Sequence, residues 1–178
     1  MLFRSKNIYV LGELIHNTQV IQELDAMGIK TINELPAKGD GICVIRSHGA
    51  SPEVFENIKK AGFEIVDLTC LDVKKVQQQA IELAKEDYFL VIVGKSEHPE
   101  VVAIKANAEL WSKNVVVASS PEKLKPYEDK IKKHKKVGVV VQTTQRVENL
   151  TKIVNYLITI SKELRIKNTI CSSTTMRQ

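Results

Sequence analysis

Two uninterrupted apolar runs constrain the fold of this chain more than any other feature. Residues Phe89–Val93 read Phe-Leu-Val-Ile-Val, and Val139–Val141 is a run of three valines. Strands that are apolar at every position are typical of parallel sheets that helices cover on both faces. Other short apolar runs alternate with amphipathic helical patterns, which gives about eight strands in all. The sequence therefore predicts an α/β fold built from three-layer units with mostly parallel sheets.

The order of these elements also predicts how the chain divides. A polar stretch after the Phe89 run separates two similar sets of strands and helices, with no low-complexity linker between them. Near the end, we expect a long helix over Arg146–Leu164 and a last strand over Ile166–Cys171. The expected units are a first α/β unit at 1–94, a second at 95–165, and the start of a truncated third unit at 166–178.

Composition excludes several classes of protein. With 43% hydrophobic and 26% charged residues among 178, extended disorder is disfavoured. No stretch approaches the roughly 20 apolar residues of a membrane helix, and the N-terminus lacks the apolar core of a signal peptide. The three cysteines are odd in number and form no C-x-x-C pair, which disfavours a disulfide framework and favours a reducing compartment. We therefore expect a cytoplasmic protein without a membrane partner.

The net charge of +5 raises the question of nucleic-acid binding. Most of the excess lies between Pro121 and Lys136, where seven lysines and three acids give a net +4. This segment contains only Tyr127 as an aromatic residue on which a base could stack. We interpret it as a solvated surface segment and expect no nucleic-acid partner.

Polar and nucleophilic residues gather at the ends of the expected strands. Ligands of parallel α/β sheets bind beyond the carboxyl ends of the strands, so these residues share one edge. His134 lies instead in the lysine-rich segment, and Cys43 lies within a strand. The residues at strand ends are His16, His48, Cys70, His98, Glu100, Gln142, Thr143, Thr144 and Cys171.

Each of these residues has an ordinary structural interpretation when it is taken alone. A single loop histidine is usually a surface or hydrogen-bonding residue, and Gln142-Thr143-Thr144 could be a helix cap. Cys43, with apolar neighbours, is best interpreted as a core residue. Together, imidazoles, hydroxyls and helix N-termini suit an anion such as phosphate, and two cysteines suit a soft metal or an iron–sulfur cluster. The residues alone predict a phosphate- or metal-binding α/β domain.

At these positions the sequence resembles a known family. The matching segments are LGELIHNTQVIQEL, VIRSHGASPEV, VDLTCLDVKKV, VGKSEHPEV, VVQTTQ and TICSSTTMRQ. In this order and spacing they are similar to the 4-hydroxy-3-methylbut-2-enyl diphosphate (HMBPP) reductases, the LytB/IspH family. The resemblance implies a trefoil of three α/β units around a [4Fe–4S] cluster. It also implies reductive removal of the substrate 4-hydroxyl, giving isopentenyl and dimethylallyl diphosphates in the non-mevalonate isoprenoid pathway.

The resemblance assigns roles to residues of this chain. Cys70 and Cys171 match the second and third cysteines that hold the cluster, and Glu100 matches the proton donor. A carboxylic acid that holds a proton near neutral pH needs a raised pKa in an enclosed site. Gln142 and Thr144 would hold the neighbouring site residues in position without contacting the substrate themselves. The residues matching the substrate-binding set are His16, His48, His98 and Thr143.

Departures from the family pattern lead to further expectations. The segment that carries the first cluster cysteine is absent from this chain, and so is the late diphosphate loop, so we expect a fragment with little or no reductase activity by itself. Leu71 and Asp72 follow Cys70 where the family has Pro and an apolar residue. Asp72 would lower the reduction potential if it faced the cluster. Gln77 and Ala103 stand where His and Gly are common.

The resemblance implies a small diphosphate substrate and an electron donor such as ferredoxin or flavodoxin. Two other interpretations stay open at this point. A diverged module could bind a phosphorylated metabolite without redox chemistry, which the residues after Cys70 and the absent first cysteine motivate. A truncated gene product without a stable fold is the third interpretation, since a missing N-terminal strand would leave a sheet edge uncovered.

Overall fold

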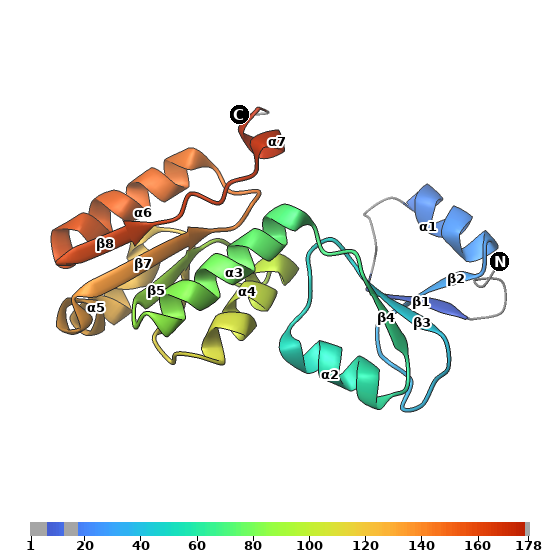
Figure 1. Ribbon diagram of the computed structural model, residues 1–178. Helices are drawn as coiled ribbons and strands as arrows, with labels where there is room; N and C mark the ends of the chain where they lie inside the picture. Colours follow the sequence, from blue (N-terminus) through green and yellow to red (C-terminus); the bar gives the residue numbers. More distant parts are fainter. Residues whose placement is uncertain (1–6, 13–17, 177–178) are drawn as a thin grey trace. The chain divides into compact units, whose positions relative to one another are not determined.

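The computed structural model of the chain describes residues 7–12 and 18–176. The chain forms two compact units, Met1–Cys70 and Leu71–Gln178, which we call unit 1 and unit 2. Each unit contains one four-stranded sheet in which every neighbouring pair of strands is parallel (Figure 1). The predicted α/β class with parallel sheets is therefore confirmed.

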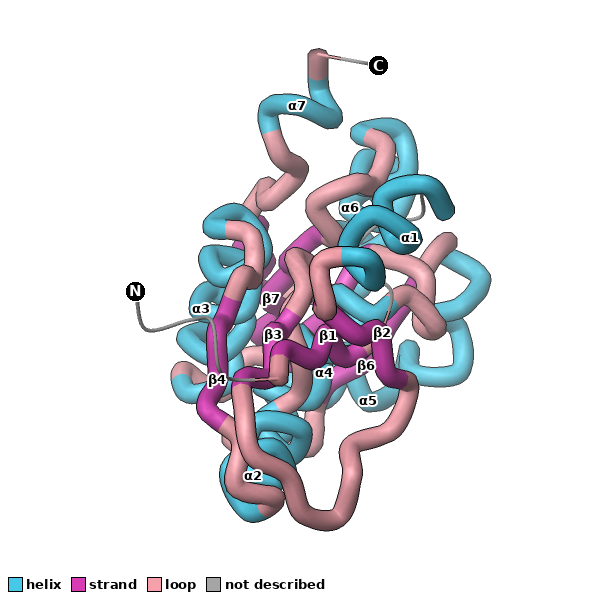
Figure 2. Tube along the Cα trace, turned by 90° about the vertical axis from the view of Figure 1, so that its right-hand side faces the viewer, coloured by secondary structure: helices cyan, strands magenta, loops and turns pink. Residues whose placement is uncertain are grey.

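The sheet of unit 1 has the strand order β2-β1-β3-β4 (Figure 2). In its register Tyr9 lies opposite Lys30 on one side and opposite Cys43 on the other. Helix α2 begins where the sequence predicts, because the Ser51 hydroxyl accepts a hydrogen bond from the Val54 N–H at 3.4 Å. The bounds are β1 Ile8–Leu11, α1 Thr18–Ala26, β2 Ile29–Ile32, β3 Ile42–Ile45, α2 Pro52–Lys60 and β4 Glu64–Asp67.

The core of unit 1 is small on both faces of its sheet. Cys43 and Ile45 point to the α2 face and pack with Ile58 and Phe63. Val10, Ile42 and Val44 point to the opposite face. Cys43 is fully buried there, as its apolar neighbours in the sequence predict.

The sheet of unit 2 has the order β6-β5-β7-β8, which repeats the connectivity of unit 1. Among the described residues, no helix is long and apolar enough to cross a membrane. The helices are α3 Leu71–Lys85, α4 Pro99–Glu109, the 3₁₀ helix η1 Pro121–Tyr127, α5 Glu128–His134, α6 Val147–Ile160 and α7 Ser172–Thr175. The strands are β5 Phe89–Val93, β6 Val115–Ala118, β7 Lys136–Val141 and β8 Glu163–Ile166.

The apolar run Phe89–Val93 forms strand β5, which helices cover on both faces of the sheet. Phe89, Val91 and Val93 pack in one cluster with the buried side chains of η1, α5 and α6. Leu90 and Ile92 pack in a second cluster with α3 and α4. Successive side chains of a strand point to opposite faces, so a strand that helices cover on both sides must be apolar throughout.

The predicted unit boundary at residue 94 is corrected to Cys70–Leu71. Strand β5, which we expected to end the first unit, lies in the middle of the second sheet. Helix α3 belongs there too, because its buried residues Val76 and Leu83 join the cluster under α4. No glycine- or proline-rich linker marks this boundary, since it falls directly between a strand-end loop and a helix.

The expected start of a third unit at residue 166 is also corrected. Helix α6 ends at Ile160, because Ser161 adopts extended backbone angles and its hydroxyl donates to the Leu157 carbonyl at 2.8 Å. The following strand, β8, therefore starts earlier than predicted and pairs with β7 through Val139 opposite Ile166. It is the fourth strand of unit 2.

Candidate functional site

The repeated connectivity defines one crevice in each unit. In the orders β2-β1-β3-β4 and β6-β5-β7-β8, the chain changes direction between β1 and β3 and between β5 and β7. Ligands of parallel α/β sheets bind at such points, outside the carboxyl ends of the strands. The sequence-predicted residues that the structure describes follow β3 and β4 in unit 1 and β5, β7 and β8 in unit 2.

In unit 1, the loops after β3 and β4 are joined by backbone hydrogen bonds. The Cys70 N–H donates to the Ser47 carbonyl at 3.0 Å, which brings the Cys70 loop against the turn that carries His48. Thr69 is buried, and its N–H donates to an Asp67 carboxylate oxygen at 2.9 Å. The Cys70 thiol itself is free and exposed. The predicted residue His16 lies outside the described residues.

In unit 2, His98 shapes the start of helix α4. Its Nδ1 accepts a hydrogen bond from the Glu100 N–H at 3.2 Å, so the imidazole caps the helix directly before Pro99. This cap turns Glu100, in the first helical turn, toward the interior, where it is only 1% exposed. The sequence His-Pro-Glu therefore serves to place one carboxyl at the end of the sheet.

Thr143 holds this buried carboxyl with two of its groups. Its N–H donates to Glu100 Oε1 at 2.7 Å, and its hydroxyl donates to Oε2 at 2.9 Å. Burial raises the pKa of the Glu100 carboxyl, and the two hydrogen bonds from Thr143 act in the opposite direction. The direction of the shift is the one that a proton-donating carboxyl requires.

Gln142 joins the loops after β5 and β7. Its Oε1 accepts from the Lys95 N–H at 3.2 Å, and its Nε2 donates to the Thr144 hydroxyl at 2.9 Å. This closeness depends on Gly94, because a Cβ there would lie 2.7 Å from a Val101 methyl and 3.0 Å from Gln142 Oε1. Gln142 and Thr144 thus brace the loop that carries Thr143.

Cys171 reaches the same loop from the far side of β7. Its N–H donates to the Thr143 carbonyl at 3.0 Å, and its thiol lies 3.0 Å from the Thr174 hydroxyl in α7. The thiol forms no disulfide and is half-buried. Thr143 is therefore bonded to both Glu100 and Cys171.

A cleft of about 520 Å³ opens beside this group, next to the first turn of α6. Positive groups dominate it, because Lys95 and Arg146 line it and the N-terminus of α6 adds a partial positive charge. Sequence reasoning missed Lys95, Ser119, Arg146 and Asn149, although the first two follow strands just as the predicted residues do. The lining includes Lys95, His98, Ser119, Gln142, Thr144 and Arg146.

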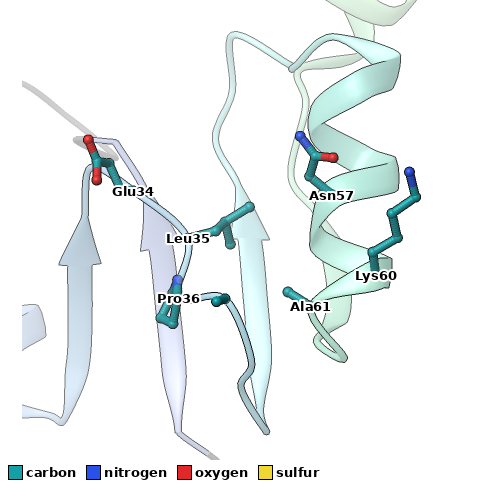
Figure 3. A pocket seen from close by; sticks show the side chains of 7 residues that line it. Glu34, Leu35, Pro36, Asn57, Lys60 and Ala61 are labelled. Atoms are coloured by element: carbon teal, nitrogen blue, oxygen red, sulfur yellow. The ribbon is translucent and has the colours of Figure 1, made fainter.

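A second depression, of about 430 Å³, lies in unit 1 between the loop after β2 and the last turns of α2 (Figure 3). Leu35, Pro36 and Ala61 give it an apolar floor, and Glu34 and Lys60 lie at its sides. Helix α2 ends there, just before β4 begins, so the depression is at the amino end of that strand. It is separate from the edge that carries His48 and Cys70.

The structure thus groups the predicted residues within each unit. In unit 2 it joins Glu100 and Thr143 directly, with His98, Gln142, Thr144 and Cys171 around them. In unit 1 it places the His48 turn beside Cys70. Within the described part of the chain, no group of three or more His, Cys, Asp or Glu side chains converges as a metal site would.

Comparison with known proteins gives consistent matches. The family model described as LytB protein matches residues 1–178. The 4-hydroxy-3-methylbut-2-enyl diphosphate reductase of Geotalea uraniireducens is 43% identical over 171 residues, which are 96% of this chain and 58% of that protein. The reductase of Aquifex aeolicus is 34% identical over 171 residues, with the same coverage. The chain therefore spans 58% of the length of these relatives.

Solved structures agree with this result. A structure described as (E)-4-hydroxy-3-methyl-but-2-enyl diphosphate reductase, the terminal enzyme of the non-mevalonate pathway, superposes with a TM-score of 0.87 at 35% identity. It matches 98% of this chain and 60% of its own. A structure described as the E-1-hydroxy-2-methyl-but-2-enyl-4-diphosphate reductase from Plasmodium falciparum gives a TM-score of 0.83 at 28% identity, over 99% of this chain and 54% of its own.

Proposed function

The chain belongs to the LytB family, and from that premise we propose that it contributes to the reductive dehydroxylation of HMBPP. In this reaction the C–O bond of the 4-hydroxyl breaks, and two electrons and two protons convert the substrate to water and isopentenyl or dimethylallyl diphosphate. The single observation that carries the proposal is the buried Glu100 carboxyl, which Thr143 holds beside the Cys171 loop.

Glu100 is the proposed proton donor. Its raised pKa keeps a proton available at a higher pH than a solvated glutamate would. Thr143 fixes the orientation of both carboxyl oxygens, so the proton is held at a defined place. The proposed substrate residues His16 and His48 would pair with diphosphate oxygens as imidazolium ions. His98, whose Nδ1 accepts from the Glu100 N–H, would instead donate to a diphosphate oxygen from Nε2 as a neutral imidazole. The cationic cleft around Lys95 and Arg146 adds attraction for an anionic substrate.

We propose that Cys70 and Cys171 ligate a [4Fe–4S] cluster. When bound, the cluster would relay the two electrons from an external donor and would offer an open iron site that acts as a Lewis acid. Neither thiol is in a disulfide and both have access to solvent, so the donor type fits. Cys43 does not fit, because it is fully buried and burial raises its pKa, which disfavours the thiolate. Since clusters of this kind use three or four ligands, the described thiols account for two of them.

The remaining parts of the proposal rest on the family. We propose that the two units are part of a three-unit trefoil, which agrees with the chain spanning 58% of its relatives. Reduction requires an electron donor, for which a ferredoxin or flavodoxin is the expected class. The cytoplasm is the expected compartment, because free thiols such as Cys70 persist where the surroundings are reducing.

A chimera tests the proposal. This chain would replace the matching 171 residues of the Geotalea uraniireducens reductase, followed by anaerobic reconstitution with iron and sulfide. We expect an EPR-active cluster and turnover of HMBPP, with turnover lost in the Glu100→Gln chimera. The isolated 178-residue chain should show little or no turnover.

One outcome would favour a different function. The chimera could fold and bind HMBPP equally well with Cys70→Ala and Cys171→Ala, without any cluster signal. Such a result would replace the reductase proposal with the non-redox module that binds a phosphorylated metabolite. This control is needed because Leu71 and Asp72 follow Cys70 at positions where the family has Pro and an apolar residue.

A further inference from the structure

The segment between β8 and Cys171 leaves the sheet but stays beside β7. The last ladder pair is Val139 opposite Ile166, and the Lys167 N–H then donates to the Val139 carbonyl at 2.8 Å. Residues 167–171 are not assigned to any strand. Some other interaction must therefore keep this segment in line with the end of β7.

Thr169 supplies that interaction through its side chain. Its hydroxyl accepts a hydrogen bond from the Val141 N–H at 2.8 Å and donates to the Val141 carbonyl at 2.5 Å. Thr169 is 7% exposed and Val141 is fully buried, so water cannot replace these bonds. One hydroxyl thus satisfies both the donor and the acceptor that a paired strand would otherwise satisfy.

The register continues to Cys171. Thr169 and Val141 are 28 residues apart, and the same offset separates Lys167 from Val139 and Cys171 from Thr143. Because each of the three residue pairs has this same offset, the segment runs alongside β7 without a slip. The Cys171 backbone is thereby fixed against Thr143, whose other groups hold the Glu100 carboxyl.

We propose that Thr169 is a positioning residue whose hydroxyl sets the register of residues 167–171 on β7 and so fixes the Cys171 thiol relative to Glu100. Its consequence for catalysis rests on the proposed function, because the thiol and the carboxyl act together only in that reaction. The register itself is a property of the chain without any ligand. An apolar side chain of the same shape would pack as well but would leave both Val141 groups unpaired in the interior.

The variants Thr169→Val and Thr169→Ser separate these two roles, since valine keeps the shape and serine keeps the hydroxyl. In the 178-residue chain, amide hydrogen exchange is measured at Val141 and Cys171. We expect exchange in the valine variant to rise by about tenfold or more. The serine variant should stay within about threefold of wild type. The amides of β5 report global unfolding and should change much less.

Thiol labelling gives a second readout in the same samples. Cys171 should react faster with a maleimide in Thr169→Val than in wild type or Thr169→Ser, and Cys70, in the other unit, should react at an unchanged rate. Mass spectrometry of the labelled peptides distinguishes the two thiols. Equal exchange and labelling at Cys171 in all three proteins would overturn the proposal.

The outcome stays decisive if Thr169→Val does not fold. In that case hydrogen exchange at the Cys171 amide of the wild-type chain still tests the proposal. Unprotected exchange at this amide would contradict a fixed register. In the reconstituted chimera, Thr169→Val should alter the EPR spectrum and the serine variant should restore it. If the wild-type chimera forms no cluster, the proposed function fails while the exchange and labelling results still test Thr169.

Discussion

Replacing Thr143 by valine tests how the buried carboxyl of Glu100 is held. The change removes the hydroxyl that donates to Oε2 at 2.9 Å but keeps the side-chain shape and the N–H that donates to Oε1 at 2.7 Å. Hydrogen bonds to charged groups contribute about 1.5–3 kcal/mol to stability. We expect Thr143→Val to lower the free energy of unfolding by about that amount when the Glu100 carboxyl is ionised.

The loss should depend on pH in a defined direction. Burial raises the pKa of Glu100 in the folded protein above the value of about 4.3 in the unfolded chain. Ionisation therefore costs folded-state stability as the pH rises from about 4.3 through the raised value. Without the Thr143 hydroxyl the folded-state pKa rises further and this cost grows. The valine variant should consequently differ less from wild type at pH 4 than at pH 8.

Urea unfolding at the two pH values provides the assay, with ¹³C NMR titration of the Glu100 carboxyl as a direct measure of its pKa. Thr143→Ser is the matched control, because it retains the hydroxyl. The reasoning is refuted if the valine variant loses as much stability at pH 4 as at pH 8. It is also refuted if the carboxyl titrates at the same pH in the valine and serine variants.

Other substitutions probe the packing and the thiols. Gly94→Ala should lower the free energy of unfolding by about 1–3 kcal/mol, because the new Cβ would lie 2.7 Å from a side-chain carbon of Val101. A loss below about 0.5 kcal/mol in urea unfolding would contradict this expectation. Leu157→Ala should cost about 2–5 kcal/mol in the same assay, whereas Ile158→Ala, at a site that is 61% exposed, should cost about 0.5 kcal/mol or less. In the native chain, a maleimide should modify Cys70 rapidly and Cys43 only on unfolding, and peptide mass spectrometry would reveal the reverse order if the burial were misassigned.

The sequence was most informative where one physical requirement acts on many neighbouring residues. A strand covered on two faces must be apolar throughout, so the run at Phe89–Val93 predicted the centre of a parallel sheet. Helix starts such as Ser51-Pro52 and His98-Pro99 were predictable because capping depends on adjacent residues. Parallel strands also bring their carboxyl ends together, which placed Glu100 and Thr143 at one edge before any contact was known.

The features that sequence reasoning missed depend on pairing between distant segments. The unit boundary at Cys70–Leu71 follows from the packing of α3 on the second sheet. The composition of the residues around the boundary does not indicate which sheet α3 packs on. The role of Thr169 depends on Val141, 28 residues earlier, so a single threonine in the sequence gives no signal. The cleft residue Arg146 is likewise recognisable only when the start of α6 is seen beside the loop after β5.

The two units have very different amounts of buried apolar material. The clusters on the two faces of the second sheet contain thirteen and twelve buried side chains among the described residues, against four and three on the first sheet. Unit 1 should therefore open by local unfolding more readily than unit 2. His48 and Cys70 belong to unit 1 and should lose their native positions whenever it opens. A ligand that engages those two residues binds only the closed form of unit 1. Its affinity and the folding equilibrium of that unit are then thermodynamically linked, and occupancy would suppress the opening.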